Sequence, residues 1–121
     1  AERDGLASIY LEELAGLPWL RLPARRDGDQ HAWQSFVTRV DPASAPASRN
    51  EIMAALAGRG IATRPGTHAV HMLGHYARTY GHQPGDFPGA RDANDNSMAI
   101  PLHNRMSRDD CAYVVEVLKS L

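Results

Sequence analysis

The stretch His31–Val40, HAWQSFVTRV, decides the fold because it is the best strand candidate in the chain. It is rich in β-branched and aromatic residues, which fit a pleated and packed surface. Its alternation of apolar and polar positions is imperfect, so we expect both faces of this strand to be covered. A second, short strand is predicted at Trp19–Leu22, and the Asp27-Gly28 pair marks the turn between the two.

Three helices are predicted around these strands. Apolar residues follow i, i+3, i+4 spacing over residues 6–14, which is typical of one buried helix face. A second helix begins at Ser48, where Glu51 completes a capping box. The last helix begins at Ser107, with Asp110 in its first turn.

Shorter elements fill the rest of the chain. We expect a strand or extended loop at Ile61–Arg64, a helix at Val70–Tyr80, a short polar helix at Arg91–Asn96 and a short strand at Met98–Leu102. The order is then α-β-β-α-β-α-α-β-α, without an internal repeat. This order predicts an α/β chain of the α+β type, in which helices cover a small, mainly antiparallel sheet. Its 121 residues fit a single domain, 1–121.

Composition excludes several classes of partner. The net charge is −1, which gives no electrostatic footprint for nucleic acid or for an anionic membrane surface. The apolar runs are too short for a transmembrane helix. The single Cys111 cannot form an internal disulfide, so we expect a cytoplasmic protein and a buried structural thiol. The chain has no initiator Met and opens in helical register, which we interpret as a fragment of a longer protein.

The candidate functional segment is Gly60–Tyr80, GIATRPGTHAVHMLGHYARTY, which holds three of the six histidines. Arg64, His68, His71 and Tyr76 can hold phosphate, carboxylate or sugar hydroxyls, and histidine can transfer protons. Arg64 is the strongest single candidate because it follows a predicted strand end, and a guanidinium can grip an anion with two parallel hydrogen bonds.

A metal site is the alternative for the histidines. His68, His71 and His75 form HxxHxxxH and would share one face if the segment were helical throughout. No Glu stands beside them as it does in HExxH, and no fourth ligand has an obvious spacing. Pro65 and Gly66 place the first histidine in a loop, so we predict no metal.

Several segments resemble the C-terminal part of the DegT/DnrJ/EryC1/StrS family of pyridoxal-phosphate-dependent sugar aminotransferases. They are AGLPWLRLP, HAWQSFVTRV, RNEIMAALAGRGIATR, the HxxxxYxxxYG run from His71, GDFPGA and SMAIPLHNRMSRDDCAYVVEVL. The resemblance implies the small domain of a fold-type I enzyme, with the domain that carries the cofactor lysine upstream. The only lysine here is Lys119, so the isolated chain is expected to be inert.

The resemblance also implies a function and partners. The whole enzyme would use pyridoxal 5′-phosphate to move an amino group from glutamate to a nucleotide-linked ketosugar, as a homodimer. Arg64 and His71 match the family's substrate-facing motif, and Tyr76 matches its aromatic position. Between Arg64 and His71, the stretch that includes His68 departs from the usual family pattern. This departure would suit a different sugar substrate.

Other classes stay open at this point. Within the family, the chain could belong to a dehydratase or a regulatory member, because the residue at the lysine position decides between them. Outside the family, the alternatives are a histidine-rich metal-binding module and a non-catalytic interaction domain.

Overall fold

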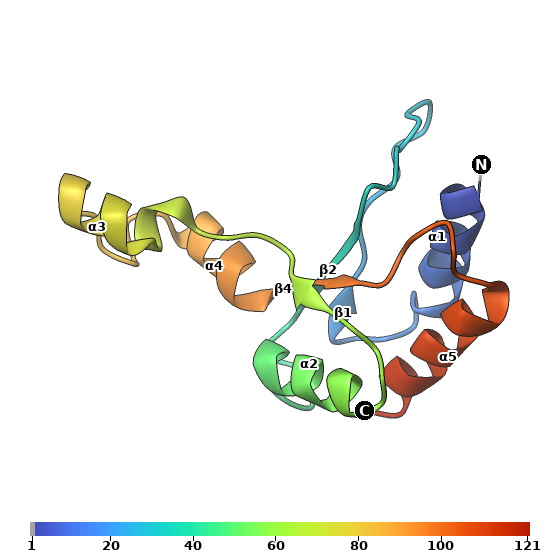
Figure 1. Ribbon diagram of the computed structural model, residues 1–121. Helices are drawn as coiled ribbons and strands as arrows, with labels where there is room; N and C mark the ends of the chain where they lie inside the picture. The colour runs from blue at the N-terminus through green and yellow to red at the C-terminus, as the bar shows by residue number, and fades with distance from the viewer. Residues whose placement is uncertain (1) are drawn as a thin grey trace.

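A computed structural model describes residues 2–121, which fold into five α-helices, one 3-10 helix and four strands (Figure 1). Their order agrees with the predicted alternation of helices and strands. The elements are α1 (Glu2–Glu13), β1 (Leu20–Arg21), β2 (Phe36–Val40), α2 (Arg49–Gly58), β3 (Arg64–Pro65), η1 (Val70–Met72), α3 (Gly74–Tyr80), α4 (Pro88–Asn96), β4 (Ser97–Ile100) and α5 (Arg108–Lys119).

The four strands form one sheet in the order β1-β2-β4-β3, and every neighbouring pair is antiparallel. Phe36 lies opposite Ile100, and Thr38 lies opposite Met98. All four of these side chains are buried, so this face of the central strand pair points into the core. The predicted class, a small antiparallel sheet covered by helices, is confirmed.

The core lies between the sheet and three helices. α1 packs against α5, and α2 packs against β4. Tyr10 of α1 is fully buried, and its hydroxyl donates to the carbonyl of Pro101 at 2.9 Å. Burial raises the pKa of Tyr10, so this hydroxyl stays protonated and serves the structure. Cys111 of α5 is buried in the same core, where desolvation raises the pKa of its thiol.

The predicted strand His31–Val40 is shorter in the structure, because β2 begins only at Phe36. Trp33 has a positive φ of 47°, which breaks the extended backbone just before the strand. This turn inserts the indole into the core, where Nε1 donates to Asp4 at 2.9 Å. The burial of a large ring therefore outweighs the strand preference of residues 31–35.

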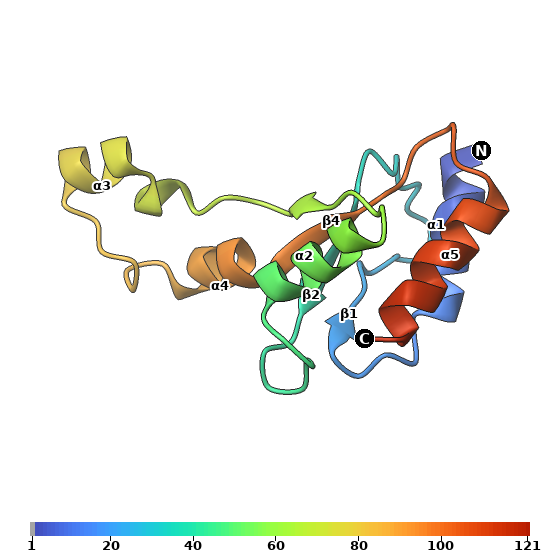
Figure 2. The same cartoon turned by 60° about the horizontal axis from the view of Figure 1, so that its bottom comes forward.

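A second difference concerns residues 66–96, called the arm below, which project from the body of the protein. Figures 1 and 2 both show α3 and α4 at the end opposite α1 and α5. The single helix predicted for Val70–Tyr80 is instead η1 followed by α3, because Leu73 between them is extended, at φ −68° and ψ 134°. Gly74 follows directly and is a poor helix former, which favours a new start there.

Two other boundaries shift. α4 begins at Pro88 instead of Arg91, because proline fits the first helical position, where no backbone N–H is needed. β4 covers Ser97–Ile100 instead of Met98–Leu102. Within residues 2–121, no helix combines the length and the apolar character required to cross a membrane.

Candidate functional site

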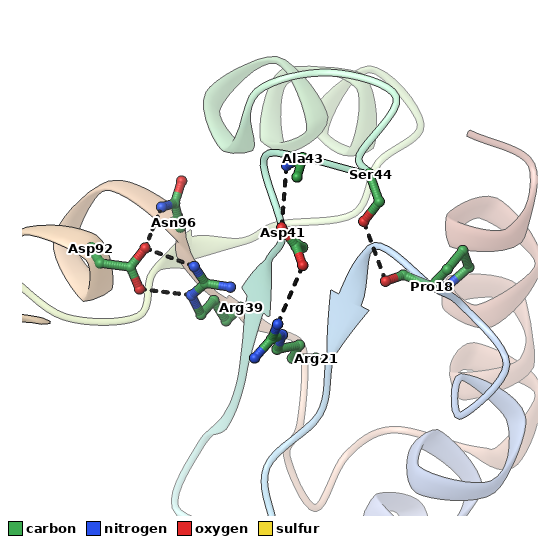
Figure 3. A network of polar contacts seen from close by, with 8 residues as sticks. All are labelled: Pro18, Arg21, Arg39, Asp41, Ala43, Ser44, Asp92 and Asn96. Atoms are coloured by element: carbon green, nitrogen blue, oxygen red, sulfur yellow. Dashed lines mark hydrogen bonds and ion pairs between the residues drawn. The ribbon is translucent and has the colours of Figure 1, made fainter.

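The arm is fixed to the sheet at its root by an ion pair. Arg39 of β2 donates from Nε and from Nη2 to the two carboxylate oxygens of Asp92 in α4, at 2.7 and 2.8 Å (Figure 3). Asn96 donates to the same carboxylate at 2.8 Å. These bonds lower the pKa of Asp92 to about 2, with the Arg39 hydrogen bond as the largest cause. The carboxylate therefore holds α4 against β2 at every pH at which it is charged.

A second group of contacts in Figure 3 fixes the neighbouring edge of the sheet. Asp41 accepts from Arg21 at 3.4 Å and from the backbone N–H of Ala43 at 3.2 Å, and Ser44 donates to the carbonyl of Pro18. These bonds join β1 to the turn after β2. The strand that carries Arg39 is thus held from both sides.

Gly66 lets the chain leave β3 at close range to the sheet as the arm begins. Its backbone N–H donates to the Ser97 carbonyl at 3.1 Å. A methyl group on Gly66 would lie 2.5 Å from Cγ1 of Val37 and 2.6 Å from Oγ of Ser97, far inside contact distance. Only glycine fits here, and this fixes the direction in which residues 67–72 continue.

The surface of the arm carries an open hollow of about 450 Å³, called the aromatic hollow below. Three of the four predicted site residues, His68, His71 and Tyr76, lie around it. Its remaining lining comes from Val70, Tyr80, His82, Phe87 and Ala90. The structure therefore brings these three predicted residues together, although the segment is not one continuous helix.

The rings of the arm contact one another in a continuous series. Tyr76 and Tyr80 lie nearly parallel, with centroids 6.3 Å apart and planes at 14°. Tyr80 is stacked on His82 at 5.9 Å, and His82 meets the edge of Phe87 at 5.3 Å. Contacts among these rings give the arm local stability that its short helices lack.

His71 lies inside the arm, with 7% of its surface exposed. Its Nε2 is 3.3 Å from the carbonyl oxygen of Pro84, and its ring packs against Phe87 at 4.9 Å. It can donate this hydrogen bond when Nε2 carries the proton. His71 thus ties the turn after α3 back to η1 and shapes the floor of the hollow.

Arg64 lies in a different place from the other three candidates. It lines a groove of about 600 Å³ between the end of the sheet and α5, together with Gln34, Ile100 and His103. Its side chain is exposed and makes no hydrogen bond or ion pair within residues 2–121. A free guanidinium beside an open groove can bind an anionic group.

The histidines do not form a common face. The extended Leu73 separates His71 from His75, and His68 and His75 are exposed while His71 points inward. In the described part of the chain, no three His, Cys, Asp or Glu side chains are grouped to hold a metal ion.

Sequence reasoning missed Tyr80, His82 and Phe87 as members of the site. One signal was available, because Tyr76 and Tyr80 stand at i and i+4 and must share a helix face. His82 and Phe87 line the hollow only because the turn after α3 folds back. The spacing of residues along the sequence does not predict that turn.

Known proteins share this arrangement of sheet, helices and arm. The family model of the DegT/DnrJ/EryC1/StrS aminotransferase family matches residues 1–119. The chain therefore belongs to this family of aminotransferases. The resemblance stated from sequence segments is confirmed.

Individual relatives agree with this assignment. The chain is 30% identical over 120 residues to the spore coat polysaccharide biosynthesis protein SpsC of Bacillus subtilis, covering 98% of this chain and 31% of SpsC. The structure matches the sugar aminotransferase CalS13 of Micromonospora echinospora with a TM-score of 0.78 and 25% identity, covering 98% of this chain and 30% of CalS13.

Another match is Spr1654 of Streptococcus pneumoniae, whose structures include a PLP form and a PMP form, with TM-scores of 0.85 and 0.86 and 25% identity. The match to the PMP form covers 98% of this chain and 29% of Spr1654. The chain thus spans about a third of the length of the relatives that it matches.

Proposed function

We propose that this chain is the C-terminal domain of a longer, pyridoxal-phosphate-dependent sugar aminotransferase. The observation that carries the proposal is a family match over residues 1–119, joined to a structural likeness to a sugar aminotransferase over 98% of the chain. The reaction would transfer the amino group of glutamate to a nucleotide-linked ketosugar. The similarity to SpsC favours a role in making a surface polysaccharide or another amino sugar.

This chain does not fit a covalent site for the cofactor. Its one lysine, Lys119, lies at the end of α5 and donates to Glu13 of α1 at 2.9 Å. This ion pair holds the lysine at the surface, outside both the aromatic hollow and the groove of Arg64. We therefore assign the cofactor lysine to the rest of the longer protein, where pyridoxal phosphate would supply the electron sink for amino transfer.

The residues of this domain would bind and orient the substrate. The unpaired guanidinium of Arg64 suits an anionic group of the sugar nucleotide, either phosphate or carboxylate. His68 and Tyr76 are exposed at the aromatic hollow and can exchange hydrogen bonds with sugar hydroxyls. His71, held by Pro84, would act as a positioning residue for both. The arm would then help to exclude water above a site shared with the rest of the enzyme.

Two further parts of the proposal concern the assembly and its location. We assign a homodimer, because the exposed apolar side chain of Leu73, on the arm but outside the aromatic hollow, suits an intersubunit surface. We assign the cytoplasm, because the free thiol of Cys111 agrees with a reducing compartment.

The substitution Arg64→Ala in the longer protein tests the role of this domain. We expect kcat/KM for the sugar nucleotide to fall at least about tenfold, because one charge-assisted contact is lost. The absorbance of the bound cofactor should not change. Arg108→Ala removes another exposed arginine, from the start of α5, and should leave kcat/KM near the wild-type value. Unchanged turnover in Arg64→Ala would remove Arg64 from the site.

A further inference from the structure

The aromatic hollow carries exposed rings that the fold itself does not bury. Tyr80, the last residue of α3, is 66% exposed, and Phe87, just before α4, is 47% exposed. Large apolar side chains that remain in water at one place mark a binding surface more often than a solvated face. We therefore treat the hollow as a candidate binding site, and the chemistry of its lining indicates which group it would bind.

The lining contains no Lys, Arg, Asp or Glu, and its polar atoms are tyrosine hydroxyls and histidine nitrogens. His82 also lies 3.6 Å from the carboxylate of Asp86. The hollow therefore lacks the guanidinium that grips phosphate with two parallel hydrogen bonds. It is a good place for a neutral, flat group with polar edges, because the edges can bond to histidine and tyrosine.

The geometry of the rings also favours a flat group. Tyr76, Tyr80 and His82 form a nearly parallel series, with interplanar angles of 14° and 30°. Tyr80 lies between the other two rings, so one more ring would stack at an end of the series, because aromatic pairs prefer offset stacking. A hollow of about 450 Å³ lies within the range of sites for small molecules and has room for a nucleoside.

We propose that the aromatic hollow binds the base of the nucleotide-linked sugar by stacking. This inference rests on the proposed function, because that function supplies a substrate with a nucleobase. It divides the recognition of the substrate between two places on the domain. The rings of the arm hold the neutral base, whereas Arg64, in its own groove beside α5, is left for an anionic group.

The test is saturation-transfer NMR on the longer protein with UMP, TMP and GMP, and with ribose 5-phosphate as the ligand without a base. We expect transfer mainly to base protons, and little binding of ribose 5-phosphate. Tyr80→Ala removes the central ring that keeps Tyr76 and His82 in series, and should weaken binding of the preferred nucleotide about tenfold, the effect of losing one stacking surface. Tyr80→Phe keeps the ring and should bind almost as well as wild type.

A control variant and three outcomes decide whether the inference holds. Leu73→Ala removes an exposed apolar side chain of the same arm that does not line the hollow, and it should not change nucleotide binding. Absence of base-dependent binding, or equal loss in Tyr80→Ala and Leu73→Ala, overturns the inference. Sedimentation in which Tyr80→Ala dissociates a dimer of the longer protein also overturns it, because the rings would then cover a second copy.

These results are separable from the proposed function. The base-binding measurements need no catalysis, so they can fail while the longer protein still aminates a sugar nucleotide. In that case only the assignment of the hollow falls. If the longer protein aminates no sugar nucleotide, the function itself falls, whatever the hollow binds.

Discussion

Replacing Gly66 by alanine should destabilise the domain although it adds only one methyl group. The added carbon would lie 2.5 Å from Cγ1 of Val37 and 2.8 Å from Cβ of Ser97, two atoms of the sheet. Neither atom is the far end of a long flexible side chain. The backbone at Gly66, where the arm begins, must therefore move away from the sheet. Overpacking of this kind costs about 1–3 kcal/mol, which for a domain of this size lowers Tm by at least about 4 °C.

The assay is urea unfolding followed by far-UV circular dichroism, with the slope m compared between variants. Gly5→Ala is the matched control, because the same methyl group in helix α1 would meet nothing within 4 Å. Alanine is the better helix former, so this control should stabilise the chain by up to about 1 kcal/mol. Opposite signs for the two variants support the reasoning. A Gly66→Ala variant as stable as wild type would refute the close approach of the arm to the sheet.

Three further predictions follow from the contacts described above. Because Arg39 and hydrogen bonds hold the pKa of Asp92 at about 2, below its ordinary value of 3.8, this carboxylate stabilises the fold fully above about pH 4 and loses its contribution as the pH falls towards 2. Both side chains are partly exposed, so Asp92→Asn should cost only about 1 kcal/mol at neutral pH and flatten the acid limb of a stability curve measured by urea titration. Ser107→Ala removes the cap of α5, where Ser107 accepts from Asp110 N–H at 3.1 Å, and should lower the free energy of unfolding by about 1 kcal/mol; no change would mean that the capping box adds nothing. His71→Ala should free the turn 81–87 without unfolding the core, seen as faster amide exchange confined to the arm; slow exchange there would contradict its role as a tether.

Local chemistry made α1, α2, α5 and the existence of the two central strands predictable. The capping box predicted at Ser48 is formed, and the predicted cap at Ser107 is likewise completed by Asp110, because a serine and an acidic residue three positions later satisfy orphan N–H groups. The buried Cys111 and the face of α5 follow in the same way from helical spacing. Such features depend on residues that are close together in the sequence, so they can be predicted from the sequence alone.

The errors arose where a distant contact overrides local preference. Trp33 breaks the predicted strand because its ring reaches the core and Asp4, almost thirty positions earlier. The predicted helix of the arm breaks at Leu73, and its histidine His71 turns inward towards Pro84. The separation of Arg64 from the hollow also depends on how the chain crosses the sheet at Gly66. Spacing along the sequence carries none of these tertiary contacts.

The most direct measurement of the central claim is transfer of isotope-labelled nitrogen from glutamate to a sugar. The protein encoded by the whole natural gene would be incubated with pyridoxal phosphate, labelled glutamate and a panel of nucleotide-linked ketosugars, and the products analysed by mass spectrometry. The account predicts label in at least one sugar nucleotide, and less of it with Arg64→Ala. Label that stays in glutamate with every sugar, from a protein that has bound its cofactor, would contradict the assignment.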